Sequence, residues 1–96
     1  MAYVLIARMK TREGEEERAL EILGRLAEAS NKEPGAIHYI PHRSTEDPRV
    51  FTIYEQYRDE AAFKEHGQTE HFRTLAAGEL FPLMEERERT FYETLD

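Results

Sequence analysis

The stretch that decides the fold is VFTIYEQY at residues 50–57. Its Val, Phe, Thr, Ile and Tyr side chains are β-branched or aromatic, the types that are enriched in strands. Successive side chains of a strand point to opposite faces, so Phe51, Ile53, Glu55 and Tyr57 share one face. The stretch therefore predicts a strand that places a carboxylate among large apolar and aromatic side chains.

Further strands and helices are expected on both sides of this strand. Apolar patterns predict strands at residues 2–10, 36–43 and 84–95. Helical spacing predicts a long helix from the turn at 12–14 to about residue 32, a short one at 59–66 capped by Asp59, and another from Thr69 to Leu80. The order β-α-β-β-α-β is typical of the ferredoxin-like α+β fold, with helices on one face of an antiparallel sheet, and residues 1–96 form a single domain.

The first expected strand carries apolar side chains on both of its faces. Tyr3, Leu5, Ala7 and Met9 lie on one face, whereas Val4 and Ile6 lie on the other. The ferredoxin-like topology covers only one sheet face with helices, and a bare apolar face is unfavourable in a monomer. Face-to-face packing of two sheets across a two-fold axis would bury it, so we expect a homodimer.

The composition excludes several classes of function. With 20 acidic residues against 13 Lys and Arg, the net charge of −7 argues against a nucleic-acid surface and against anionic membranes. Cysteine is absent, which excludes disulfides, thiolate nucleophiles and sulfur-ligated metals. No apolar run is long enough to span a membrane, and a cytoplasmic location is expected.

Glu55 and two histidines are the candidate chemical groups. A buried carboxylate must be hydrogen-bonded, paired or protonated, so Glu55 is either a structural anchor or a proton acceptor. His66 lies beside the apolar face of its helix, His71 lies in the first turn of the next, and Gly67 allows the bend that brings both imidazoles toward one cavity. The alternative is two partly buried histidines bonded to backbone carbonyls.

The remaining histidines, charged residues and aromatic residues have simpler structural explanations. With Glu55 the two histidines make a conceivable set for non-haem iron, but nothing in their spacing enforces it, and no metal site is predicted. His38 and His42 share one strand face near a sheet edge and are expected to face solvent or a dimer partner. The acidic and basic run at 85–89 is expected to be a solvated strand or a surface of salt bridges between strands. Aromatic side chains could line a flat apolar cavity; those proposed as substrate-binding are Tyr39, Tyr57, Phe63 and Phe72.

A resemblance to a known protein family extends over nearly the whole chain. The residues that carry it are 33–39 (EPGAIHY), 42–44 with 47–48, 54–63 (YEQYRDEAAF) and 66–72. The sequence resembles the antibiotic biosynthesis monooxygenase family, and most of all its small quinol-monooxygenase branch. Two departures are visible: Glu70 replaces a common Pro, and Ala7, Met9 and the absence of Trp disfavour the haem-degrading relatives. The resemblance implies a dimeric α+β barrel.

The resemblance also implies a reaction. It is the oxygenation of a quinol-like or polycyclic aromatic small molecule by O₂ without a cofactor, with Glu55, His66 and His71 as the catalytic residues and Tyr57 as their aromatic neighbour. A histidine is the expected base, because its unperturbed pKa of about 6.5 is closer to neutrality than that of glutamate. The same fold also hosts isomerases of small carbonyl metabolites and non-catalytic ligand-binding modules, so both remain alternatives.

Overall fold

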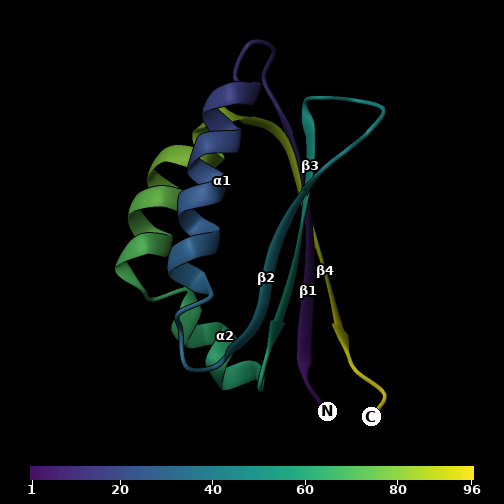
Figure 1. The fold of residues 1–96 in the computed structure, drawn as a ribbon, viewed down its shortest axis with the longest axis vertical. Coiled ribbons are helices and arrows are strands. Elements are labelled where there is room, and N and C mark those ends of the chain that lie inside the picture. The colour runs from purple at the N-terminus through teal and green to yellow at the C-terminus, as the bar shows by residue number, and fades with distance from the viewer.

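An antiparallel sheet in the strand order β2-β3-β1-β4 forms one layer of the molecule, and helical segments form the other (Figure 1). The computed structural model describes all 96 residues. The elements are β1 (Tyr3–Thr11), α1 (Glu16–Ser30), β2 (Ala36–Arg43), β3 (Val50–Tyr57), α2 (Glu60–His66), η1 (Phe72–Leu80), η2 (Phe81–Leu83) and β4 (Met84–Glu93). The order confirms the expected ferredoxin-like β-α-β-β-α-β fold.

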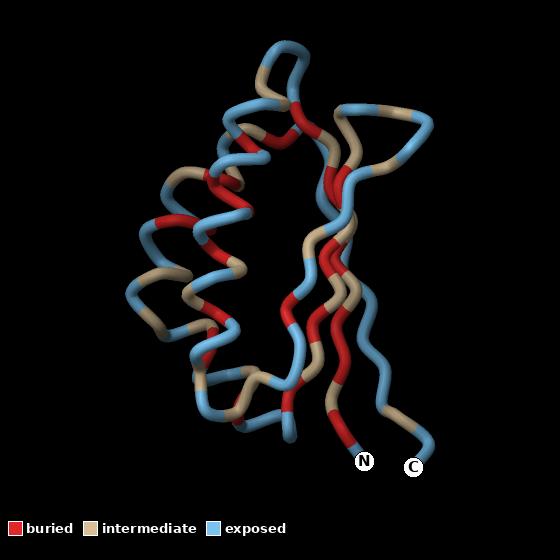
Figure 2. The backbone as a smooth tube through the Cα atoms, viewed as in Figure 1, coloured by how far each residue is buried: buried red, intermediate tan, exposed pale blue.

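The core lies between the two layers, where Figure 2 shows the buried backbone positions facing one another. Strand β1 pairs with β3 on one side and with β4 on the other, so it is central. One sheet face contributes Leu5, Met9, Phe51 and Ile53, among others, and α1 packs Ile22, Leu23 and Leu26 against them. The helix-spaced apolar residues of α1 therefore form the stripe that the sequence predicts.

The second helical region consists of three short segments. Asp59 caps α2, as predicted, because its Oδ1 accepts a hydrogen bond from the Ala62 N–H at 2.8 Å. The next segment, η1, is a π-helix rather than the α-helix that its apolar spacing suggested, and η2 is a short 3₁₀ turn. Phe72, Ala76 and Leu80 are spaced four residues apart, which is close to one turn of this helix. The three side chains therefore lie along one face.

The opposite face of the sheet is uncovered by any helix (Figure 1). The central Val4 and Ile6 lie on it, together with Ile40 of β2, which is 45% exposed, and Tyr92 of β4, which is 51% exposed. His38 and His42 are exposed on the same side, as predicted. No helix combines the length and the apolar character that a membrane span would need.

Candidate functional site

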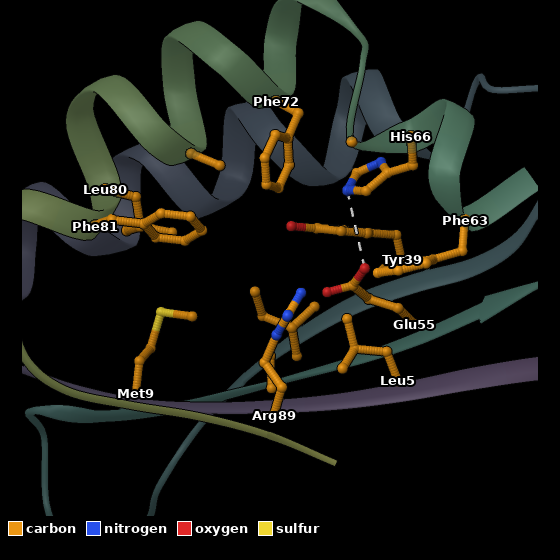
Figure 3. A pocket seen from close by; sticks show the side chains of 14 residues that line it. Leu5, Met9, Tyr39, Glu55, Phe63, His66, Phe72, Leu80, Phe81 and Arg89 are labelled. Carbon is orange, nitrogen blue, oxygen red and sulfur yellow. Dashed lines mark ion pairs between the residues drawn. The ribbon is translucent and has the colours of Figure 1, made fainter. Parts of the chain in front are cut away.

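A cavity of about 60 Å³ lies between the sheet and the α2–η2 region. Ten of its 14 lining residues are hydrophobic (Figure 3). The lining consists of Leu5, Ala7, Met9, Tyr39, Ile53, Glu55, Phe63, His66, Gly67, Phe72, Ala76, Leu80, Phe81 and Arg89. Pockets for drug-sized ligands are about 300 Å³ or larger, so an aromatic ligand enters only if lining side chains move aside.

Glu55 is the acidic group of this cavity, and the alternation of β3 puts it there. Its side chain is buried, and the Tyr57 hydroxyl donates a hydrogen bond to its Oε1 at 2.5 Å. Burial raises the pKa of Glu55 to about 7, because a charged carboxylate is poorly solvated there, and the nearby charge of Glu33 adds to the rise. The Tyr57 hydrogen bond and the Arg89 charge oppose it. Near neutral pH this carboxyl can therefore both take and give a proton.

His66, the last residue of α2, faces Glu55 across the cavity wall (Figure 3). Its side chain is 2% exposed, and its Nε2 lies 3.8 Å from Glu55 Oε1. Its Nδ1 lies 2.8 Å from Glu33 Oε2. Because a carboxylate only accepts hydrogen bonds, Nδ1 carries the proton in that contact. Burial lowers the pKa of His66, so the ring is neutral and its unprotonated Nε2 is directed at Glu55.

Glu33 joins both histidines from the turn between α1 and β2. Its Oε2 accepts from His66 Nδ1 and, at 2.6 Å, from His71 Nε2. The turn is tied to the sheet by Asn31, whose side-chain amide exchanges two hydrogen bonds with the Tyr39 backbone, at 2.9 and 3.0 Å. Glu33, His66 and His71 are also the residues that could hold a metal ion, since their donor atoms lie within 4.8 Å of one another.

Arg89 supplies a positive charge at the cavity. The register of β1 with β4 pairs it with Ala7, which puts it on the helix-covered sheet face. Although Arg89 is exposed, its side chain reaches the cavity lining (Figure 3). Residues 85–89 are exposed, and Glu86 and Glu88 form salt bridges with Arg8 of β1, as expected. The contact of Arg89 with the cavity is an addition that the sequence did not predict. Its neighbour Arg87 stacks on the Phe81 ring, with 3.6 Å between the guanidinium carbon and the ring centroid.

The sequence profile of the antibiotic biosynthesis monooxygenase family matches residues 2–78. The chain belongs to this family. Among solved structures, it resembles a putative antibiotic biosynthesis monooxygenase from Nitrosomonas europaea, with 27% identity, a TM-score of 0.92 and coverage of 98% of this chain and 90% of that one. A Pseudomonas aeruginosa protein matches at 29% identity and a TM-score of 0.91, covering 99% and 95% of the two chains.

A third structure resembles this monooxygenase-family chain closely but carries a more cautious description. It is a Bacteroides thetaiotaomicron protein of unknown function, described as a possible oxidoreductase, with 27% identity, a TM-score of 0.89 and coverage of 97% of both chains. No curated protein sequence gives a significant match. Together, the family and these neighbours support a general monooxygenase-like function.

Of the residues predicted from the sequence to form the site of this monooxygenase-family chain, some line the cavity and others do not. Glu55, His66, Tyr39, Phe63 and Phe72 line the cavity. The Tyr39 hydroxyl points into it (Figure 3), and burial together with the charges of Glu55 and Glu33 raises the pKa of this phenol.

Tyr57 and His71 do not line the cavity. Tyr57 is fully buried behind Glu55, and His71 lies beyond Glu33, with a side chain that is 22% exposed. Tyr57 is hydrogen-bonded to Glu55 and His71 is hydrogen-bonded to Glu33, so each is one hydrogen bond away from the site. Glu33 and Arg89 are the polar groups that the sequence-based proposal did not include.

Proposed function

We propose that this chain is a monooxygenase that oxidises a quinol-like aromatic molecule with O₂, the substrate itself supplying the electrons. The observation that carries the proposal is the neutral His66, whose Nδ1–H is held by Glu33 and whose free Nε2 faces the cavity beside Glu55. A base of this kind, at an apolar cavity, is suited to removing a proton from a phenolic O–H or an activated C–H.

The proposed reaction balances without a resident cofactor. His66 Nε2 takes a proton from the substrate, and the resulting anion transfers electrons to O₂. One oxygen atom forms a bond to a substrate carbon, and the other leaves as water with the two hydrogens that the substrate gives up. The Arg89 guanidinium favours the anion electrostatically, and the apolar lining keeps bulk water from the reactive species.

The size of the cavity favours a small substrate. At about 60 Å³ it is much smaller than an aromatic ligand requires. The half-buried Phe72 and Phe81 on its helical side are the side chains best placed to move, whereas the sheet side is formed by tightly packed residues such as Leu5 and Ile53. A one- or two-ring quinol requires less displacement than a polycyclic anthrone, so it is the preferred substrate class.

The test is O₂ uptake with a panel of hydroquinones and anthrone-type compounds. Removing a general base typically lowers the rate by about 10²–10⁴-fold, so His66→Ala is expected to lose activity by that factor. His38→Ala, which changes an exposed histidine on the opposite sheet face, is the matched control and is expected to retain it. Circular dichroism confirms that both variants fold. Equal rates in wild type and His66→Ala would contradict the proposal.

A second candidate function is isomerisation of a small carbonyl metabolite. It is favoured by the closeness of Glu55, whose pKa is raised to about 7, to the neutral His66, since two such groups can move a proton between neighbouring atoms of a substrate. This reaction consumes no O₂. Turnover under anaerobic conditions would therefore identify the isomerase and exclude the oxygenase.

We also propose that the chain works as a homodimer. The uncovered sheet face contains the half-buried Ile6 and Tyr54 and the exposed Ile40 and Tyr92, and packing it against a second copy would remove these side chains from water. The helix-covered face, with the cavity, would then lie on the outside of each protomer.

A further inference from the structure

Glu33, His66 and His71 form a cluster of side chains, and the proposed oxidation uses only two of them. His66 acts as the base and Glu33 orients it, but His71 has no task in that reaction. We propose that the three side chains form a binding site for a divalent transition-metal ion of the Zn²⁺ type, and that the ion blocks the catalytic base. The second part of this statement depends on the proposed function, whereas the binding site itself does not.

The donor set and its geometry suit such an ion. Two imidazole nitrogens and one carboxylate oxygen are ligands that Zn²⁺ accepts, and three protein ligands leave a fourth position open for water. Oε2 of Glu33 lies 2.8 Å from His66 Nδ1 and 2.6 Å from His71 Nε2. Around a tetrahedral Zn²⁺ with bonds of about 2.0–2.1 Å, these donors stand about 3.3 Å apart. To admit the ion, His66 Nδ1 has to withdraw from the oxygen by about 0.5 Å and His71 Nε2 by about 0.7 Å. The two nitrogens, which lie within 4.8 Å of each other, also have to settle at about 3.3 Å.

The three ligands come from separate segments whose positions the fold constrains. Glu33 lies in the turn before β2, His66 ends α2, and His71 directly precedes η1. The side chains of His66 and Glu33 are 2% and 12% exposed, whereas that of His71 is 22% exposed. His71 is thus the side from which an ion can enter.

A second observation supports the site, namely the groups that surround the ligands. Metal-bound histidines usually donate their other ring N–H to a carboxylate, which orients the ring. His66 Nε2 faces Glu55 at 3.8 Å, and Glu55 is itself held by the Tyr57 hydroxyl. With an ion on Nδ1, the proton of His66 resides on Nε2 and points to Glu55. The nitrogen that would accept the substrate proton is then occupied, so the metal-bound form is inactive.

Calorimetric titration of chelator-treated protein with ZnCl₂ tests the site directly. We expect one ion per chain and a rise in the unfolding temperature, since a ligand that binds only the folded state stabilises it. Co²⁺ provides a second probe, because its visible absorption reports coordination by protein ligands. Loss of an outer partner costs metal affinity about 10–100-fold, so loss of the ligands in Glu33→Gln or His71→Asn should weaken binding by at least 10-fold.

The matched control is the double variant His38→Asn, His42→Asn. These exposed histidines are four residues apart on a strand, about 13 Å, and cannot share an ion within one chain. The control should bind Zn²⁺ as the wild type does. Binding that survives in Glu33→Gln and His71→Asn, both shown to be folded, or that disappears in the control, would overturn the proposal, as would the absence of binding to wild type.

The result of the zinc-binding test does not depend on the result of the O₂-uptake test. Zinc binding is measured without substrate, so it stands or falls whatever the chain oxidises. Where metal-free protein consumes O₂, added ZnCl₂ should abolish uptake over the concentration range in which the ion binds. Uptake that continues at saturating Zn²⁺ would overturn the inhibitory part of the proposal.

Discussion

Glu55 is a titratable group held in an apolar sheet face, and its surroundings determine how the protein responds to pH. Its pKa is raised from 4.5 to about 7, chiefly by burial. The folded chain therefore binds more protons at this site than the unfolded chain does between these two values. As a result, the contribution of Glu55 to stability falls as pH rises from about 4.5 to about 7, and it is constant above that range.

We predict that Glu55→Gln becomes more stable relative to wild type as pH rises. A shift from 4.5 to about 7 corresponds to at most about 3 kcal/mol between pH 4 and pH 8. Urea unfolding at several pH values measures the free energy of unfolding of both proteins. Subtracting one value from the other at each pH cancels the contributions of the other titratable groups. Glu65→Gln, an exposed change on the same helix as His66, serves as the control. A Glu55→Gln difference that does not change with pH would contradict this account.

The residues of the site differ in how visible they are in the sequence. Strand alternation alone put Glu55 on the face that proved to be the buried one. Glu33 gave no comparable signal, because it lies in a turn and its partners are 33 and 38 residues further along the chain. Arg89 was detectable in principle: alternation along β4 places Arg87 and Arg89 on one face and Glu86 and Glu88 on the other, but the charges made the whole run resemble a solvated strand.

At the level of elements, the turn before β2 and the helix α2 are packed so closely that they fix His66. A Cβ added at Gly35 would lie 2.4 Å from the Ala62 Cβ, which is far below a normal contact. The Arg58 N–H also donates to the Gly35 carbonyl at 2.8 Å. Only glycine permits this approach, and the distance from Glu33 to His66 depends on it.

We therefore predict that Gly35→Ala is destabilising by about 1–3 kcal/mol, because overpacking forces the turn away from α2. It should also reduce activity, since the Glu33–His66 hydrogen bond shifts with the turn. Gly24→Ala is the control: this glycine lies in α1 with nothing within 4 Å of an added Cβ. The same substitution there should stabilise by about 0.5–1 kcal/mol, because Ala is the better helix former. Thermal unfolding compares the two, and equal effects would refute the close-packing argument.

The elements themselves were largely predictable. Strand and helix positions follow from apolar periodicity and the Asp59 cap, and α1 ends only about two residues before its expected end. The π-helical geometry of η1 was not predictable, because its apolar spacing is compatible with either kind of helix.

At the scale of the whole molecule, the uncovered sheet face determines the expected assembly. We predict that wild type has twice the chain mass in light scattering at micromolar concentration, and that Ile6→Glu shifts it to the monomer. Ile6 is central on that face, so a charge there opposes burial. Leu20→Glu places the same charge on the exposed side of α1 and should leave the dimer intact. A monomeric wild type would overturn the prediction.

The charged strand β4 has a further consequence, for aggregation. It is one of the two edges of the sheet, and all but its first residue are exposed. Unpaired edges readily recruit strands from other chains, and rows of charged side chains prevent this. At the other edge, Pro41 lacks an N–H to donate. The charged run of β4 that contains Arg89 therefore also opposes the assembly of this protein into fibrils through the free edge of its sheet at high concentration.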